Sequence, residues 1–314
     1  MKKQTAGIHH ISAIVGHPQE NIDFYSGVLG LRLVKQTVNF DDPGTYHLYF
    51  GDEGGNPGTI ITFFPWPNAR QGRIGDGQVG VTSYVVPTGA LDFWEKRLRK
   101  YDVEFEKVKR FGETYLQFDD PHGLHLELVA REAGEENAWS VDDVTREVAI
   151  KGFGGATLYS SAPDETAATL TDVLGLEMMG VEGDYTRFKA SADIGNIIDL
   201  KMVTGDRGTI GAGTVHHIAW RANDKADHLE WQEYAMNHGQ HVTEVKDRNY
   251  FDAIYFRESG KILFEIATDP PGFAIDESVE TMGMKLMLPP QFEQQRERLV
   301  QSLIPIQVPS NKVR

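Results

Sequence analysis

Residues 7–15 read GIHHISAIV, and residues 214–222 read TVHHIAWRA. Each segment places a His-His pair before an isoleucine at the head of an apolar run. A second repeat is the tetrapeptide VLGL, which occurs at residues 28–31 and again at residues 173–176. There an amphipathic segment ends at glycine, and a new apolar run begins. Because similar segments recur at matching places, the sequence predicts a chain built from repeated structural units.

Four units around these echoes share one order of elements: a strand, a helix and three more strands. In the first unit, a strand expected over 9–15 precedes a helix over 18–29, whose apolar residues recur at helical spacing. Strand-like runs follow at 31–40, 46–50 and 59–64. We predict four modules and a C-terminal extension with a helix, bounded as follows: 1–70, 78–131, 152–204, 213–269 and 270–314.

One such unit buries only one face of a small sheet, so it must pair with another unit. We predict an α+β fold in which four βαβββ modules pair into two curved-sheet cups. The open concave face of a cup suits a ligand site. If His10 and His217 share one metal ion, module 1 pairs with module 4, and modules 2 and 3 form the other cup.

The composition narrows the class of protein. The 314 residues contain 31 Lys and Arg against 46 Asp and Glu, and a net charge of -15 disfavours nucleic acid and anionic membranes as partners. The absence of cysteine excludes disulfide scaffolds, thiolate metal sites and cysteine nucleophiles. No apolar run approaches the roughly 20 residues that cross a bilayer. With no apolar leader in MKKQTAGIHH, we expect a cytoplasmic protein with a small-molecule partner, and a homo-oligomer is left open.

Two histidines and one carboxylate indicate a metal site. His10 and His217 lie at matching strand heads, and Glu265 is a lone carboxylate in the apolar run KILFEIA at 261–267. A buried carboxylate needs a cation or a strong donor, and a buried arginine is the alternative to a metal. Two imidazoles and a carboxylate leave positions open for substrate and O₂ and are typical of Fe(II), although Mn(II) fits almost as well.

Either histidine of each pair can serve as the ligand, because successive strand residues point to opposite faces. We favour the second of each pair, which leaves His9 and His216 to pack or to hydrogen-bond behind the ligands. Thr62 aligns with Glu265 in module 1, so a fourth ligand is not expected there. Tyr255, ten residues before Glu265, lies on the preceding strand and within reach of the metal.

The other two modules carry carboxylates at the position of Glu265. Glu127 and Asp199 stand there, and neither module has a histidine at its strand head. We therefore interpret both carboxylates as structural or vestigial.

Three stretches carry a family resemblance: residues 9–59, TVHHIAW at 214–220, and DRNYFDAIYFRESGKILFEIATD at 247–269. Together they resemble the vicinal oxygen chelate superfamily of glyoxalases, bleomycin resistance proteins and extradiol dioxygenases. More narrowly, they are similar to hydroquinone 1,2-dioxygenases and related ring-cleaving dioxygenases of bacteria. The resemblance implies that the iron ligands are His10, His217 and Glu265. It also implies catalytic residues beside the substrate: His9, His216, Arg248 and Tyr255.

The expected activity is therefore an Fe(II)-dependent ring-cleaving dioxygenase that acts on hydroquinone-like aromatic substrates with O₂. A glyoxalase-type metal-dependent isomerase or transferase is one alternative, although Thr62 at the fourth ligand position argues against it. The other is a metal-free small-molecule binding protein, which leaves the coincidence of two His-His pairs and a buried glutamate unexplained. Catechol-cleaving relatives draw their ligands from the second half of the chain, where Gly155 replaces the expected first histidine.

Overall fold

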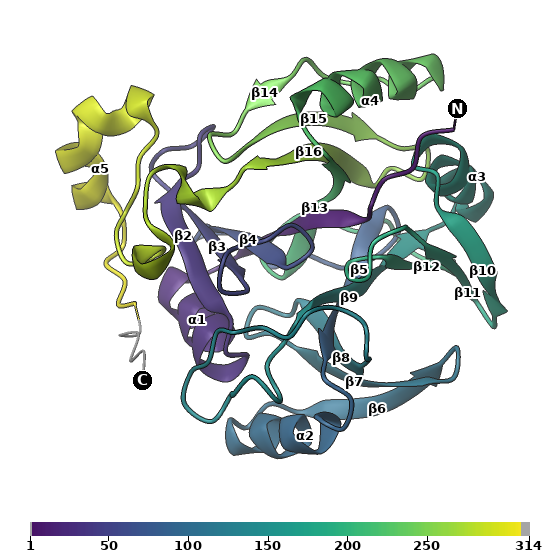
Figure 1. Cartoon of the computed structure of the whole chain (residues 1–314), viewed down its shortest axis with the longest axis horizontal. Coiled ribbons are helices and arrows are strands. Elements are labelled where there is room, and N and C mark those ends of the chain that lie inside the picture. Colours follow the sequence, from purple (N-terminus) through teal and green to yellow (C-terminus); the bar gives the residue numbers. More distant parts are fainter. Residues whose placement is uncertain (1, 309–314) are drawn as a thin grey trace.

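The repeated units form two curved sheets of eight strands each (Figure 1). The computed structural model describes residues 2–308. The first sheet contains, in spatial order, β14 (Lys246–Asp247), β15 (Phe251–Arg257), β16 (Leu263–Pro271), β13 (Thr214–Ala222), β1 (Ile8–Val15), β4 (Ile60–Pro65), β3 (Tyr46–Gly51) and β2 (Arg32–Val38). The second contains β10 (Glu177–Glu182), β11 (Tyr185–Lys189), β12 (Ile197–Met202), β9 (Gly152–Ser160), β5 (Gln78–Val86), β8 (His125–Ala130), β7 (Glu113–Asp119) and β6 (Phe105–Arg110).

The two central strands of each sheet come from different modules and run antiparallel. In the first sheet β1 pairs with β13, and in the second β5 pairs with β9. Each central strand also pairs in parallel with the last strand of its own module. The predicted α+β fold of paired modules is confirmed, with module 1 against module 4 and module 2 against module 3. The module boundaries remain a proposal, and residues 1 and 309–314 lie outside the described residues.

The first four helices pack against the sheets, and the fifth belongs to the C-terminal extension. They are α1 (Pro18–Ile22), α2 (Leu91–Lys100), α3 (Pro163–Ala168), α4 (Lys225–Asn237) and α5 (Arg296–Ser302). π-Helical turns continue two of them, η1 (Asp23–Val28) after α1 and η2 (Thr169–Val173) after α3. Short 3-10 turns complete the C-terminal part: η3 (Phe273–Ile275), η4 (Val279–Thr281) and η5 (Pro290–Gln295). No helix in the described part of the chain is long and apolar enough to span a membrane.

The repeated VLGL tetrapeptide has a common structural reason. In modules 1 and 3 the π-helical turn is capped by the leucine before the glycine, Leu29 and Leu174. The chain then reverses through Gly30 at φ +70° and Gly175 at φ +76°, in the left-handed region that glycine adopts without strain. A Cβ on Gly175 would lie 2.2 Å from the carbonyl oxygen of Lys3. The echo therefore marks the point where each short helix turns back into the sheet.

The central strands are buried on both faces, so their polar residues need partners. Every residue of β1 is buried, although the strand contains His9, His10 and Ser12. Buried polar side chains are nearly always hydrogen-bonded or bound to an ion. The polar residues of β1 therefore locate the part of the cup where chemistry is expected.

The cup of the second sheet is filled by ion pairs. Asp199 occupies the strand position that Glu265 occupies in the first cup, because each lies on the strand parallel to the head strand of its module. Arg187 donates to both Asp199 oxygens at 2.7 and 2.8 Å. Arg110 bridges Asp199, at 2.7 Å, and Glu127, at 3.0 Å. Both carboxylates are thus neutralised by guanidinium groups, which supports their interpretation as structural.

The C-terminal extension forms a strap over the first sheet and contains the predicted helix as α5 (Figure 1). The buried Lys35 ammonium on β2 pairs with Asp276, at 2.6 Å, and with Glu277. The Gln36 side chain donates to the Gly283 carbonyl at 2.9 Å. The strap therefore covers the edge strand of this sheet, whose free backbone groups would otherwise be open to other chains.

Candidate metal centre

Three neighbouring strands bring His10, His217 and Glu265 together. His10 on β1 lies opposite Ala219 on β13, which in turn lies opposite Glu265 on β16. His217, two residues before Ala219, faces the same side because side chains alternate along a strand. The ligand atoms of the three residues all lie within 4.8 Å of one another. Segments more than 200 residues apart in the chain thus meet because module 1 pairs with module 4.

The geometry of the three side chains fits a metal ion. The two Nε2 atoms lie 3.3 Å apart, and Glu265 Oε2 lies 2.8 Å from His217 Nε2 and 3.6 Å from His10 Nε2. The Glu265 side chain is fully buried, and neither oxygen has a hydrogen-bond partner of good geometry. Among the described residues, no lysine or arginine lies within 4 Å of Glu265, so the arginine alternative is not seen. Three converging lone-pair donors with no lysine or arginine beside them are what a divalent cation requires.

The first histidine of each pair orients the second. His10 Nδ1 lies 2.9 Å from His9 Nδ1, and His217 Nδ1 lies 2.8 Å from His216 Nδ1. A metal at Nε2 leaves the proton of each ligand on Nδ1, so His10 donates to His9 and His217 donates to His216. Such bonds behind a ligand fix its ring orientation and raise its basicity.

Burial keeps His9, His216 and His217 neutral. Burial, followed by the charge of His217, lowers the pKa of His216 to about 4. Burial likewise lowers the pKa of His217 and lowers that of His9 well below its usual value. Only a neutral imidazole has a lone pair for a metal, so the site is ready to bind a cation at neutral pH.

Tyr255 and Arg248 form the adjoining wall. Tyr255 on β15 lies directly opposite Glu265, and its ring meets the His217 ring edge-on at 5.8 Å between centroids. Arg248 Nε donates to the Tyr255 hydroxyl at 3.1 Å, and Arg248 Nη1 lies 3.3 Å from Asp41 Oδ2. Tyr255 therefore lies beside the candidate ligands, and Arg248 is bound to its hydroxyl.

A cavity of about 240 Å³ opens over the three candidate ligands. Its other lining residues include His216, Arg248 and Tyr255, together with Phe64, Trp66 and Phe251. His9 is the exception among the predicted residues. Its side chain is buried behind His10 and packs on Phe251 at 5.3 Å between ring centroids, rather than lining the cavity.

Sequence reasoning missed three polar residues of the opposite wall: Ser12, His47 and Tyr49. Tyr49 lies opposite Thr62, and Thr62 lies opposite Ser12, so the three strands present these groups on one face. The signal for His47 was present in the strand-like run YHLYF, where two polar-tipped residues stand two apart between apolar ones. Without the strand register, their partners could not be identified.

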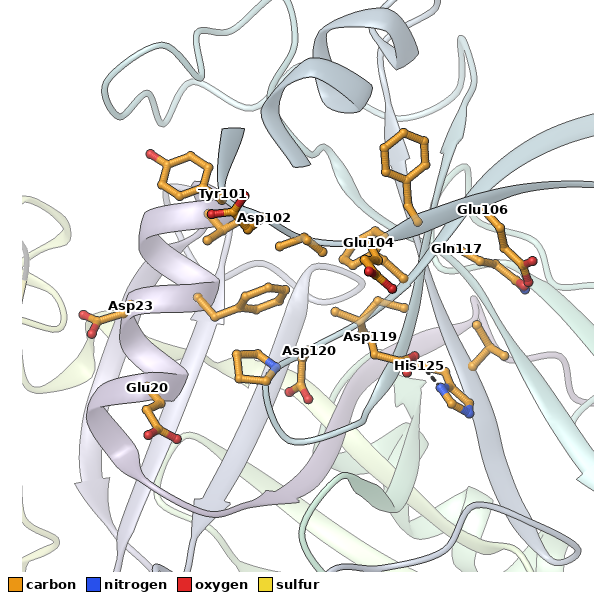
Figure 2. A pocket seen from close by; sticks show the side chains of 18 of the residues that line it. Glu20, Asp23, Tyr101, Asp102, Glu104, Glu106, Gln117, Asp119, Asp120 and His125 are labelled. Carbon is orange, nitrogen blue, oxygen red and sulfur yellow. Dashed lines mark hydrogen bonds and ion pairs between the residues drawn. The ribbon is translucent and has the colours of Figure 1, made fainter. Parts of the chain in front are cut away.

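A larger hollow, about 1120 Å³, lies elsewhere, between α1 and the β6–β7 side of the second sheet (Figure 2). Acidic side chains surround it, including Glu20, Asp23, Glu104 and Asp119. His125 is its one histidine, and that ring is paired with Asp119 at 2.6 Å. This hollow therefore lacks the converging imidazoles that a catalytic metal site of this kind requires.

Comparisons with known proteins identify the family. The family described as "Glyoxalase/Bleomycin resistance protein/Dioxygenase superfamily" matches residues 7–128 and 152–276. The "Putative ring-cleaving dioxygenase MhqO" of Bacillus subtilis is 69% identical over 308 residues, which cover 98% of this chain and 99% of that protein. A "Chlorohydroquinone/hydroquinone 1,2-dioxygenase" of Sphingobium indicum is 33% identical over 314 residues, covering 96% and 97% of the two chains.

Solved structures give the same result. A crystal structure of a putative dioxygenase from Bacillus subtilis superposes with a TM-score of 0.97 at 69% identity, covering 98% of this chain and 99% of that one. Glyoxalase I from Zea mays, at 13% identity, a TM-score of 0.61 and 84% and 92% coverage, shares the fold alone. The chain belongs to the glyoxalase, bleomycin resistance protein and dioxygenase superfamily.

Proposed function

We propose that this protein is an Fe(II)-dependent dioxygenase that uses O₂ to cleave the ring of hydroquinone-like substrates. The observation that carries the proposal is the set of three buried donors, two imidazoles and one carboxylate, beneath a cavity large enough for a single aromatic ring. A facial set of this kind leaves positions open for a substrate oxygen and for O₂. The relatives named above, a ring-cleaving dioxygenase and a hydroquinone 1,2-dioxygenase, support the same reaction.

His10 Nε2, His217 Nε2 and a Glu265 oxygen would hold the metal. Iron(II) would supply the redox chemistry that connects an electron-rich ring to O₂, and Mn(II) suits the same ligands. The protein's part is to fix the ligands, and His9 and His216 do so by accepting the Nδ1 protons of His10 and His217.

Tyr255 and Arg248 would act on the substrate side. Burial, followed by the negative charge of Glu265, raises the pKa of the Tyr255 hydroxyl well above its usual value, so this group stays protonated. Arg248 holds the hydroxyl from behind. A fixed hydroxyl and a guanidinium beside the metal can hold a phenolate oxygen or donate to a developing oxyanion.

The apolar wall would exclude water and stack on the ring. Phe64, Trp66 and Phe251 line the cavity, and their faces offer a flat apolar surface to an aromatic substrate. A dry cavity strengthens the electrostatic effect of the donors on its other walls.

The site does not favour glyoxalase-type chemistry. The cluster of candidate ligands among the described residues contains three groups rather than four. Thr62 stands at the strand position of the missing carboxylate, and its hydroxyl is bound to Ser12 Oγ at 2.7 Å and to His47 Nε2 at 2.8 Å.

Oxygen uptake tests the proposal. Protein loaded anaerobically with Fe(II) is expected to bind about one iron per chain, as one facial site requires, and to consume O₂ with hydroquinones in preference to catechols. The Glu127→Gln variant, altered in the other cup, serves as the matched control and retains iron and turnover. Turnover of a thiol adduct by Zn(II)-loaded protein, with no oxygen uptake on any ring, would show that the proposed reaction is wrong.

A further inference from the structure

Four polar side chains form a continuous chain along the module 1 wall of the cavity. Ser12 Oγ lies 2.7 Å from Thr62 Oγ1, and Thr62 Oγ1 lies 2.8 Å from His47 Nε2. The Tyr49 hydroxyl lies 2.9 Å from His47 Nδ1. We call Ser12, Thr62, His47 and Tyr49 the hydroxyl–imidazole chain. It crosses the neighbouring strands β1, β4 and β3, and three of its members line the cavity.

The chain begins beside the candidate ligands. Ser12 is opposite His217 across β1 and β13, and it is two residues after His10 on the same face of β1. Ser12, Thr62 and Tyr49 are almost fully buried, and the His47 ring is stacked between Tyr49, at 4.1 Å, and Phe64, at 4.3 Å between centroids. The packing leaves the four groups little freedom to find other partners.

Counting protons shows that the chain has two equivalent arrangements. Burial, followed by the charge of His10, lowers the pKa of His47 well below its usual value, so the ring is neutral and carries one proton. Four groups with one proton each share three hydrogen bonds, so one proton at an end is left over. Either Ser12 donates into the cavity and Tyr49 donates to His47, or every bond is reversed and Tyr49 holds the free proton.

We infer that the hydroxyl–imidazole chain conducts the proton of a ring hydroxyl away from the metal site, with His47 as the positioning residue that sets its direction. This inference rests on the proposed function for the substrate class, a phenol or hydroquinone. The substrate hydroxyl gives its proton to Ser12, Ser12 to Thr62, and Thr62 to His47 Nε2. His47 Nδ1 gives its proton to the Tyr49 oxygen, and Tyr49 releases its own proton to a water molecule that enters at the Tyr49 end of the wall, away from the bound ring.

The step balances and leaves every hydrogen bond of the chain reversed, so the hydroxyls and the His47 proton return to the second arrangement before the next turnover. One proton leaves the ring hydroxyl, one appears at Tyr49, and no electrons move. The four groups end in the first arrangement, in which Ser12 donates toward the new phenolate oxygen. An imidazole suits the centre of such a chain because it can accept a proton at one nitrogen while it releases another from the second.

Two variants distinguish proton conduction by Thr62 and His47 from a purely structural role of these residues. Thr62→Val removes one hydroxyl at nearly constant shape and cuts the chain between Ser12 and His47. His47→Gln keeps a donor and an acceptor for its neighbours, but an amide does not pass a proton from one end to the other. Thr82→Val is the matched control, because the buried Thr82 hydroxyl in the second sheet has no partner.

Steady-state oxygen uptake by the Fe(II)-loaded enzyme is the first measurement. We expect Thr62→Val and His47→Gln each to lower kcat about 100-fold, the usual size of a lost proton-transfer group. The amount of bound iron and the KM should stay near the parent values. The double variant should be no slower than either single variant, because Thr62 and His47 act in series in one proton path. Thr82→Val keeps the parent kcat. Parent-like turnover by His47→Gln would show that His47 only supports the fold.

Anaerobic proton release is the second measurement and needs no turnover. A pH indicator follows hydroquinone binding to the Fe(II) protein without O₂. The parent is expected to release its proton promptly, whereas Thr62→Val binds hydroquinone equally and releases it about 100-fold more slowly. Equal release rates, or no release by the parent, overturn the inference. Release without any oxygen uptake by the parent would leave the chain in place and refute the proposed dioxygenase function instead.

Discussion

Replacing Glu265 by glutamine should change stability in opposite directions with and without metal. In the metal-free protein this carboxylate is fully buried, has no hydrogen bond of good geometry and lies more than 4 Å from every described lysine and arginine. A buried polar group left unsatisfied costs about 1–3 kcal/mol, and a charge costs more. Glutamine removes the charge at nearly the same shape, so metal-free Glu265→Gln should be more stable than the parent.

The expected change in melting temperature follows from the change in free energy of unfolding and the length of the chain. A gain of about 1–3 kcal/mol should raise Tm by about 2–10 °C for a unit of this length. With Fe(II) present the order reverses. Loss of a group behind a ligand costs about 10–100-fold in metal affinity, so loss of a ligand itself should cost at least about 100-fold. That factor removes about 2.7 kcal/mol of the stabilisation that bound metal provides.

Thermal unfolding at pH 8, in chelator and in anaerobic Fe(II), measures both effects. Glu127→Gln is the control, because the same change in the second cup breaks the ion pair with Arg110 and leaves that guanidinium with Asp199 alone. Breaking a buried ion pair costs about 3–5 kcal/mol, so that variant should melt lower in both conditions while iron affinity stays unchanged. A lower melting temperature for metal-free Glu265→Gln, or parent-like iron affinity, would refute the reasoning.

Three further outcomes are expected. Tyr255→Phe should keep bound iron and the fold but lower kcat about 10²–10³-fold, the usual cost of a lost oxyanion donor, and Arg248→Ala should do the same. Turnover of Tyr255→Phe within twofold of the parent would exclude the Tyr255 hydroxyl from the chemistry. His216→Ala should weaken iron binding about 10–100-fold, measured by competition with a chelator, because His217 loses the group that accepts its Nδ1 proton. In the unfolded chain a histidine takes up a proton near pH 6.5, whereas in the folded protein the pKa of His216 is lowered to about 4. The metal-free protein should therefore lose stability as the pH falls from about 6.5 to 4. Equal free energies of unfolding at these two pH values would contradict this.

The candidate ligands could be found from the sequence because each carries a local signal. His10 and His217 repeat at matching strand heads, and Glu265 interrupts an apolar strand. Pairing of modules 1 and 4 then followed from the need to bring the three groups together. Each step used one residue and its immediate neighbours, which is the range over which strand patterns can be read.

The opposite wall could not be found in this way. Ser12, Thr62 and His47 stand on three strands, and only the register between those strands makes them neighbours. Register is a property of the folded sheet, since a shift of one residue would turn each side chain to the other face. Alternation along the strand predicted that His9 lies behind His10, but it could not predict that His216 lines the cavity while His9 does not.

The arginine-filled cup has a consequence for how the molecule responds to chelators. In that cup the cations are covalently part of the chain, so no chelator can extract them, whereas the first cup depends on a dissociable ion. Removing metal should therefore speed amide hydrogen exchange in β1, β13 and β16 and leave β5, β9 and β12 unchanged. The second sheet thus serves as a built-in reference, against which the contribution of the ion to local opening can be measured within one chain.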